Sequence, residues 1–303
     1  MLNIAIIILN WENAPATLEC TRSVLDDMDL SSEHVHSHLW IVDNGSSDQS
    51  ADVIKNWVNT NVADNLVTVI ENPENTGFSA GMNKGIFAAA KNAQINYFWL
   101  LNNDLTVETG SLIKLSQSIM KDPAVAIWGP TVIDAATLKV QCAGGCIYYR
   151  WLGKEKRAFA GLKTSQLPHI EPPALDYIYG AAMLIKNELL NRLHGLNEDY
   201  FLYYEELDLV EHLNTSETLG WCQGAKVVHK GGDSSTDKKA KAFAAYHAAL
   251  SAFKYTWRYH PLCLPSVILF RVFGLPLFAL RYKNPRLALA PFRALRDFLR
   301  PAA

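Results

Sequence analysis

The stretch Tyr97-Phe-Trp-Leu-Leu-Asn102-Asn103-Asp104 is an apolar run that ends abruptly at two amides and a carboxylate. A short apolar run of this kind is typical of a strand buried on both faces of a sheet. Such a strand would carry Asp104 to the sheet edge, where a carboxylate can help to hold a hard cation and a diphosphate. Alone, these three polar residues would be an ordinary β-turn, so the interpretation depends on the rest of the chain.

Three other short apolar segments, at residues 4–9, 39–42 and 66–70, precede the strand expected at 97–101. The intervening segments are long enough for helices. This alternation predicts βαβ units and an α/β fold with a mostly parallel sheet flanked by helices, with functional residues at the carboxyl ends of the strands. Pro15 and Thr17 lie where the first helix should start. Ser46, Ser47 and Asp48 can cap a second helix that begins near Gln49.

The amino-acid composition of the chain excludes some classes of protein. The chain has 303 residues, is 49% hydrophobic and carries a formal net charge of -2, which excludes a disordered protein and predicts no nucleic-acid partner. Its five cysteines are scattered, which favours reduced thiols in a cytoplasmic setting. The segment 1–9 lacks a basic leader, so we expect a core strand there and not an export signal.

Three glycines, Gly77, Gly81 and Gly85, fall four residues apart and predict one face of a helix. For Gly81 and Gly85, close packing of that helix on the sheet and contact with a ligand are both open. Gly77, at the expected loop–helix junction, is the better candidate for a backbone that approaches a ligand. The spacing matches neither the dinucleotide-binding pattern nor the Walker loop.

Asp43 ends a predicted strand and precedes a turn, so its carboxylate is placed to accept hydrogen bonds from a nucleobase or a ribose. The alternative role is a helix or turn cap. Because Ser46, Ser47 and Asp48 can cap the helix, we expect Asp43 to be free for a ligand.

An acidic cluster, Glu205, Glu206 and Asp208, follows a run of aromatic residues. Apolar surroundings and neighbouring carboxylates both raise a carboxyl pKa, which turns a glutamate into a usable general base. The competing interpretation is a solvated helix N-terminus, where the helix dipole favours acids.

His229 follows an apolar pair and precedes Gly231-Gly232, which predicts a strand end beside a loop. A single histidine is more often structural, but a neutral imidazole here could complete a cation site begun by Asp104. Lys230, Ser234 and Ser235 could contact phosphate oxygens.

The segment 261–303 is expected to form a C-terminal helical tail distinct from residues 1–260. It is strongly apolar from 262 to 280, is interrupted by Pro265, Arg271 and Pro276, and ends in a series of arginines. These features make it a poor spanning helix. A helix pair on an anionic membrane surface, and a tail packed on the catalytic domain or on another subunit, both remain open.

At these residues the chain resembles the family 2 glycosyltransferases, in particular a bacterial rhamnosyltransferase-like and galactofuranosyltransferase-like branch. The matching stretches lie in the family's order over roughly residues 3 to 260 and cover residues 8–11, 42–48, 75–83, 100–104, 180–185, 195–198, 201–209 and 228–232. The resemblance implies the GT-A fold, with a mostly parallel Rossmann-like sheet.

The resemblance also implies the roles of individual residues. Asp104 and His229 would be ligands of a divalent metal, Mg²⁺ or Mn²⁺, and Glu206, with Glu205 beside it, would supply the catalytic base. The nucleotide-sugar donor would contact Asn10, Glu12, Asp43, Gly77, Phe78, Asn83, Asn103 and Gly180.

The chain departs from the family pattern at three places. The acidic pair is Glu205-Glu206 where the family has Glu-Asp, His212 stands where an arginine is usual, and Leu250-Ser251 replaces an Arg-Asn pair. The last change puts phosphate or acceptor contacts from that helix in doubt.

Together these features predict an inverting transfer of a sugar from a nucleoside diphosphate, dTDP or UDP, to a hydroxyl of a glycan or lipid-linked glycan acceptor. The expected setting is bacterial cell-surface polysaccharide assembly, with the enzyme in the cytoplasm or peripheral on the inner face of the plasma membrane, and a homodimer is considered. The rival functions are a nucleotide-sugar-binding protein without activity and a nucleotidyltransferase.

Overall fold

The computed structural model describes residues 1–63, 65–171, 174–231, 238–274 and 285–300. Its central sheet has the strand order β3-β2-β1-β4-β11-β6-β12-β5, with β7 paired to β6. The strands of this sheet are β1 (Leu2–Asn10), β2 (Val35–Asp43), β3 (Val67–Glu71), β4 (Tyr97–Asn102), β5 (Leu105–Val107), β6 (Val125–Asp134), β7 (Val140–Ala143), β11 (Ala182–Lys186) and β12 (Thr218–His229).

The four strands expected from the sequence are present, and β1, β2, β3 and β4 pair in parallel. The second half of the sheet is mixed, because β11 runs antiparallel to both β4 and β6, and β5 runs antiparallel to β12. The expectation of a mostly parallel sheet therefore holds for the first half. Only a two-residue turn separates β4 from β5, and this connection is too short for the crossover helix that joins parallel strands.

Helices cover both faces of the sheet. The α-helices are α1 (Ala14–Ser31), α2 (Ser50–Asn61), α3 (Phe78–Ala89), α4 (Ser111–Lys121), α5 (Asn187–Leu193), α6 (Glu205–Val210), α7 (Lys238–Tyr259), α8 (Leu264–Leu269) and α10 (Pro285–Phe298). Ile6 and Trp99 pack with α1, α2 and α4, whereas Ile7 and Phe98 pack with α3 and α5. Because side chains alternate along a strand, the fully apolar sequence of β4 is explained by burial on both faces. Each such buried aromatic side chain contributes about 1.5–3 kcal/mol of burial free energy.

The glycines on α3 are packing residues. A Cβ on Gly81 would come within 2.7 Å of Leu9, and one on Gly85 within 2.6 Å of Ile7. Close packing of α3 on β1, one of the two alternatives open from the sequence, is therefore the role of both residues.

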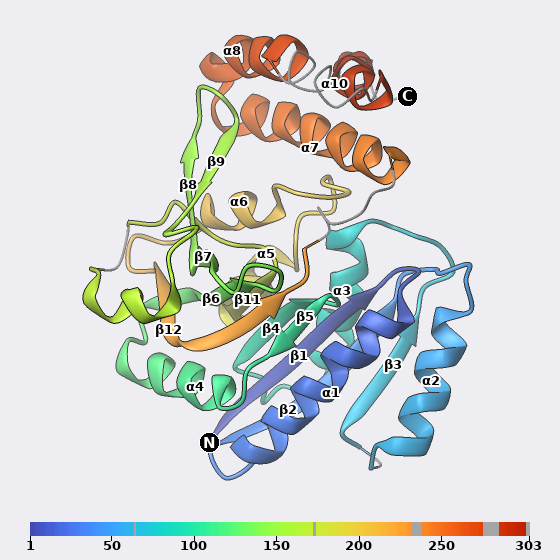
Figure 1. Ribbon diagram of the computed structural model, residues 1–303, viewed down its shortest axis with the longest axis vertical. Coiled ribbons are helices and arrows are strands. Elements are labelled where there is room, and N and C mark those ends of the chain that lie inside the picture. The colour runs from blue at the N-terminus through green and yellow to red at the C-terminus, as the bar shows by residue number, and fades with distance from the viewer. Residues whose placement is uncertain (64, 172–173, 232–237, 275–284, 301–303) are drawn as a thin grey trace.

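A second, smaller sheet has the strand order β10-β8-β9. Its strands are β8 (Gly145–Tyr149), β9 (Lys154–Arg157) and β10 (Tyr177–Ile178), and the 3-10 helix η1 (Thr164–His169) follows β9. Figure 1 shows the β8–β9 hairpin reaching from the central sheet towards α7 and α8. At its tip the Gly153 carbonyl accepts hydrogen bonds from Tyr204 and Arg271.

The C-terminal helices form a layer at one end of the molecule (Figure 1). Two further short elements, η3 (Pro261–Cys263) and the π-helix η4 (Phe270–Gly274), flank α8. Val267, Val272 and Ala294 are buried in the same apolar cluster as α7 and the central sheet. Within the described ranges, no helix combines the length and the apolar character needed to cross a membrane.

Candidate active site

Asp104 lies in the turn between β4 and β5, and His229 is the last residue of β12. The antiparallel pairing of β12 with β5 places His229 opposite Leu105, and the N–H of Lys230 donates to the Asp104 carbonyl at 3.1 Å. As a result, Nε2 of His229 lies 3.2 Å from Oδ1 of Asp104. The sequence expectation that these two distant residues meet is confirmed, while their role as metal ligands stays a prediction.

Gln141 on β7 orients the imidazole of His229, because its Oε1 lies 2.6 Å from Nδ1. An amide oxygen can only accept, so Nδ1 donates to Gln141, and in a neutral ring the lone pair would lie on Nε2, on the side of Asp104. A carboxylate and an imidazole lone pair side by side suit a divalent cation. Among the described residues no group of three or more His, Cys, Asp or Glu side chains could enclose a metal ion. The donor set therefore fits a cation whose remaining ligands come from phosphate and water.

Asp43, at the end of β2, is buried, and its carboxylate is engaged by its neighbours. The Asn10 amide and the Ser46 hydroxyl donate to Oδ1 at 2.6 and 2.7 Å, and the Ser46 N–H donates to Oδ2 at 3.0 Å. A carboxylate has about four acceptor positions, so Oδ2 retains capacity for one ligand donor.

The expected capping arrangement near Asp43 is confirmed only for Asp48, whose Oδ1 accepts the N–H of Ser50 at 3.1 Å. Helix α2 begins at Ser50, and Gln49 precedes it with φ of 65° and without a side-chain cap. Ser46 binds Asp43 instead, and the Ser47 hydroxyl donates to Glu12 at 2.6 Å. Asp43 is therefore held in place by Ser46 and is not left free by it.

A chain of hydrogen bonds connects the Asp43 region to the Asp104 turn. The Asn103 amide donates to the Thr17 hydroxyl at 3.0 Å, and Thr17 donates to Asn10 Oδ1 at 2.6 Å. Asn10 then donates to Asp43. Asn10 and Asn103, expected to contact the donor, thus fix the relative positions of the two strand ends.

Asn44, which the sequence analysis did not single out, organises the loop before α3. Its Oδ1 accepts from the Asn72 amide at 3.0 Å, and its Nδ2 donates to the Gly77 carbonyl at 3.0 Å. Gly77 has φ of +88°, and a Cβ there would lie 2.6 Å from the Phe201 carbonyl. The close approach expected for Gly77 is therefore to the chain's own residue 201, which also accepts from the Phe78 N–H at 2.7 Å.

Asn83 is expected to contact the donor, but the structure uses its amide elsewhere. Nδ2 donates to the Leu196 carbonyl at 2.9 Å and to Glu198 at 2.8 Å, and Oδ1 accepts from the Leu196 N–H at 2.8 Å. Asn83 is buried on α3 and holds the loop that leads into the acidic cluster. It offers no free polar group to a ligand in this conformation.

Glu205 and Glu206 begin α6 and are both buried. Within the described part of the chain, Oε2 of each residue has no hydrogen-bond partner. Burial raises the pKa of Glu205 to about 7, and burial together with the charge of Glu205 raises the pKa of Glu206 well above its usual range. Raised carboxyl pKa values of this kind suit proton transfer, as the aromatic context predicts.

Gly180 connects the acidic pair with the metal candidates. A Cβ on Gly180 would lie 3.3 Å from Oε1 of Glu206, a tight contact that would press on the carboxylate. The preceding residue, Tyr179, places its ring 6.3 Å from that of His229, edge to face. The following residue, Ala181, accepts the N–H of Asn102 at 3.0 Å. One short segment therefore borders Glu206, His229 and the end of β4.

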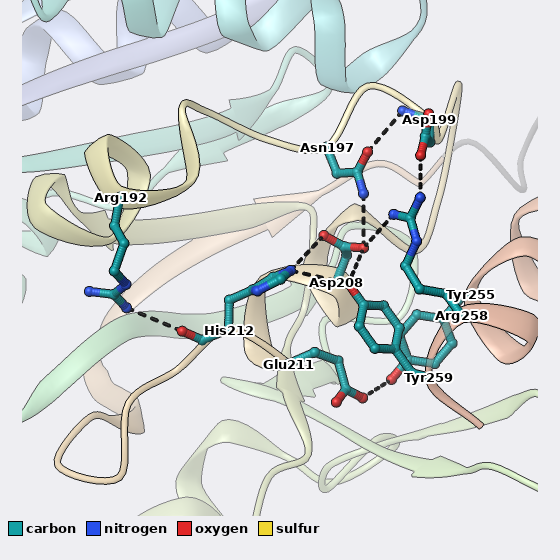
Figure 2. A network of polar contacts seen from close by, with 9 residues as sticks. All are labelled: Arg192, Asn197, Asp199, Asp208, Glu211, His212, Tyr255, Arg258 and Tyr259. Carbon is teal, nitrogen blue, oxygen red and sulfur yellow. Dashed lines mark hydrogen bonds and ion pairs between the residues drawn. The ribbon is translucent and has the colours of Figure 1, made fainter.

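Asp208, the third acid of the cluster, has a different environment (Figure 2). Oδ1 accepts from Asn197 at 3.0 Å and from the Tyr259 hydroxyl at 2.9 Å, and it lies 3.5 Å from Nη1 of Arg258. Nε2 of His212 lies 3.7 Å from the other oxygen, Oδ2. This residue ties α6 to α7 and is committed to structure.

The two remaining departures from the family pattern have structural counterparts. Arg258 brings a guanidinium to Asp208 from α7, beside the position where His212 replaces the usual arginine. The Ser251 hydroxyl donates to the Leu202 carbonyl at 2.9 Å, so this helix position supports the aromatic run. Lys230 pairs with Glu19, and Ser234 and Ser235 lie outside the described residues.

The chain is similar in sequence to one known family and to one curated protein. The sequence pattern of Glycosyl transferase family 2 matches residues 4–191, more than half of the chain. The low-salt glycan biosynthesis hexosyltransferase Agl10 of Haloferax volcanii is 23% identical over 193 residues, which cover 62% of this chain and 57% of that protein. The chain thus spans little more than half the length of this curated relative.

Two solved structures have the same fold. The mannosyltransferase PcManGT from Pyrobaculum calidifontis, in complex with GDP-Man and Mn²⁺, has a TM-score of 0.57 and 15% identity, and the match covers 98% of this chain and 86% of that one. GalNAc-T7 with UDP, GalNAc and Mn²⁺ has a TM-score of 0.57 and 14% identity, with 82% and 48% covered. The architecture is the GT-A fold, and with the sequence match over residues 4–191 the chain belongs to glycosyl transferase family 2.

Proposed function

We propose that the chain is an inverting glycosyltransferase that moves a hexose from a dTDP- or UDP-linked donor to a hydroxyl of a glycan acceptor in cell-surface polysaccharide assembly. The observation that carries the proposal is the 3.2 Å approach of His229 to Asp104, beside the segment that also borders the buried Glu206. The relative from Haloferax volcanii is described as a hexosyltransferase of glycan biosynthesis, and both solved structures contain a nucleotide or nucleotide sugar. These descriptions support the reaction class.

Glu206 is the proposed base. It would take the proton of the acceptor hydroxyl while that oxygen attacks the anomeric carbon from the face opposite the diphosphate. Its unpartnered buried Oε2 is available for that proton, and the nearby Glu205 makes the carboxylate more basic. General-base assistance of this kind contributes about 10²- to 10⁴-fold to the rate.

Asp104 and His229 are the proposed residues that hold Mg²⁺ or Mn²⁺. A divalent cation there would neutralise the charge that develops on the departing diphosphate. The protein prepares this arrangement through Gln141, which fixes the imidazole so that Nε2 faces Asp104. Asp43 would accept a hydrogen bond from the base or ribose through Oδ2.

A panel of nucleoside diphosphate sugars, incubated with purified protein and Mn²⁺, tests the proposal by release of nucleoside diphosphate. We expect release from at least one dTDP- or UDP-linked donor, and a large loss of release in Asp104→Asn. The matched control is Asp52→Asn, which removes a carboxylate from the exposed side of α2 and should act like the wild type.

Two other outcomes would replace the proposal. Release of pyrophosphate from a nucleoside triphosphate would identify a nucleotidyltransferase. Donor binding without any release, unchanged by Glu206→Gln, would identify a sugar-nucleotide-binding protein.

We also propose that the C-terminal layer rests on the cytoplasmic face of an anionic membrane. Apolar side chains are exposed on it, and arginines are exposed along α10 and just after its end: the apolar residues are Leu262, Leu269, Phe273, Leu289 and Phe292, and the basic ones are Arg286, Arg293, Arg296 and Arg300. Apolar insertion and arginine contacts with lipid headgroups act together at such surfaces.

Flotation with vesicles tests the membrane contact. Binding should require anionic phosphatidylglycerol, weaken at high salt, and fall in the double variant Phe273→Ser/Phe292→Ser. Met120→Ser, which removes an exposed apolar residue from α4, is the control. Equal binding by both variants would contradict the proposal, and a dimer in sedimentation that Phe273→Ser/Phe292→Ser disrupts would assign this face to a second copy of the chain.

A further inference from the structure

An open cavity of about 630 Å³ lies beside the second sheet, and the proposed donor and base residues are not part of its lining. Its lining comes from β9 and the following loop and consists of Glu155, Lys156, Arg157, Phe159, Ala160 and Leu162. Two cations, one carboxylate and one aromatic ring form a lining typical of polar ligands with a flat apolar face. The neighbours of this lining decide which ligand it fits.

Arg157 connects the cavity to the metal candidates. Its guanidinium carbon lies 4.8 Å from the centre of the Tyr179 ring, and the same ring is 6.3 Å from that of His229. Nε of Arg157 donates to Glu155 at 3.2 Å. In the described part of the chain, the hydrogen bonds of this guanidinium engage Nε, so the terminal nitrogens can donate to a ligand in the cavity.

Glu155 connects the cavity to the acidic pair. Its second oxygen, Oε2, accepts from the Tyr177 hydroxyl at 2.5 Å. Tyr177 belongs to β10, and β10 contacts α6, the helix that begins with Glu205 and Glu206. Since both Glu155 oxygens are already used, this residue positions Arg157 and does not itself compete for an anion.

Phe159 supplies the apolar face. Its backbone has φ of +54°, a left-handed conformation that is unfavourable for an aromatic residue, and its ring packs at a tilt against Trp221 with 5.9 Å between centroids. Backbone strain of this kind concentrates at ligand sites, where the surrounding structure maintains it. The ring can lie against the apolar face of a sugar.

We infer that the β9 cavity binds the acceptor glycan, and that Arg157 and Lys156 select acceptors whose sugar carries an anionic group, either a carboxylate or a phosphate. The inference rests on the proposed transfer reaction, because it assigns the acceptor side of that site. A guanidinium fork matches either anion by paired hydrogen bonds. The lining connects through Tyr179 to His229 and through Tyr177 to the helix that carries Glu206, where an accepting hydroxyl is needed.

Calorimetric titration of the protein with UDP and Mg²⁺ already present tests the inference without an identified acceptor. The probes are glucose, glucuronic acid and glucose 6-phosphate, which share a ring and differ in the anion. We expect one or both acidic sugars to bind about tenfold more tightly than glucose, and the stronger of the two identifies the anion. Arg157→Gln should remove that preference, Arg157→Lys should keep part of it, and thermal unfolding checks that each variant is folded.

The matched control is Lys154→Gln, which removes a positive charge from the same strand outside the cavity lining. It should leave the preference intact. Equal binding of all three sugars, no measurable binding of the acidic sugars, or an unchanged preference in Arg157→Gln would overturn the inference. Loss of UDP binding in Arg157→Gln would overturn it too, because Arg157 would then serve the donor. Failure of UDP to bind the wild-type protein would instead count against the proposed function.

Discussion

At the ends of β1 and β2, Asp43 receives three hydrogen bonds from Asn10 and Ser46. At the start of α6, by contrast, Glu205 and Glu206 each keep a buried oxygen without a hydrogen-bond partner among the described residues. The first region fixes a shape, since its polar groups are committed to one another. The second stores unfavourable free energy, because burial of an unpartnered carboxyl is costly. We call the network of Asn10, Asp43 and Ser46 the committed region and the Glu205–Glu206 pair the uncommitted region. In the proposed reaction the committed region positions the donor and the uncommitted region performs the proton transfer.

The backbone that leads into the acidic pair is also strained. Tyr203 and Tyr204, which lead into the acidic pair, have φ of +67° and +76°. A left-handed backbone at a non-glycine residue costs on the order of 1–3 kcal/mol and persists where the surroundings enforce it. The tyrosine at 204 is held by its hydrogen bond to Gly153, so the hairpin tip and the acidic cluster are mechanically linked.

The largest effect is expected when the uncommitted region loses its base. Glu206→Gln should lower turnover by about 10²- to 10⁴-fold, because general-base assistance disappears while the side-chain volume is kept. Donor affinity, measured by titration, should change little. Glu188→Gln, an exposed residue on α5, is the control. A parallel loss of donor affinity and turnover would place Glu206 in donor binding.

The free energy of unfolding of the protein should depend on pH through Glu205. The folded-state pKa of Glu205 is raised from 4.5 to about 7, so the folded protein retains a proton that the unfolded chain releases. Stability is then greatest below about pH 4.5 and falls as the pH rises towards 7, by on the order of 3 kcal/mol at most. Glu205→Gln should flatten this dependence in urea unfolding and should be more stable than the wild type at pH 7.5. An unchanged slope would show that the carboxyl is solvated.

The committed region should respond in the opposite direction. Asp43→Asn replaces an acceptor of three hydrogen bonds with a group that also presents buried N–H donors to Asn10 and Ser46. We expect a loss of about 1–3 kcal/mol in the free energy of unfolding, together with weaker donor binding. Urea unfolding and titration with UDP measure the two effects. A variant as stable as the wild type would contradict the assignment of Asp43 to a committed network.

The smallest predicted effect concerns the orientation of His229. Gln141→Leu removes the acceptor of the Nδ1–H at similar volume. Loss of such a partner costs about 10-fold or more in metal affinity, so the Mn²⁺ concentration for half-maximal donor release should rise by that factor. Gln223→Leu on β12 serves as the control. A Mn²⁺ requirement that stays the same would assign Gln141 to packing alone.

The amino-acid sequence predicted the four parallel strands because runs such as 97–101 are apolar at every position, and their polar ends located Asn10, Asp43 and Asp104. Short strands were harder to predict. β5 has only three residues, too few for its alternation to predict a strand, and β9 reads Lys-Glu-Lys-Arg, which has no hydrophobic period. Long-range pairing makes both of them strands.

Among the site residues, those at strand ends could be located, whereas their partners could not. Gln141, Thr17 and Arg157 act through contacts with residues distant in the chain, and no local pattern marks them. Gly77 and Asn83 show the reverse limit, because residues in a recognisable motif turned out to bind the chain's own backbone at 201 and 196. Motif membership predicted a region, and the tertiary structure decides the contacts of each residue in it.

Electron paramagnetic resonance of Mn²⁺ bound to the protein with UDP tests whether Asp104 and His229 hold one ion, because the spectrum reports magnetic coupling to a nitrogen nucleus. We expect nitrogen coupling in the wild type that disappears in His229→Gln while UDP still binds, and a weaker Mn²⁺ affinity in Asp104→Asn. A wild-type spectrum without nitrogen coupling, or coupling that survives in His229→Gln, would show that Asp104 and His229 do not hold one ion together.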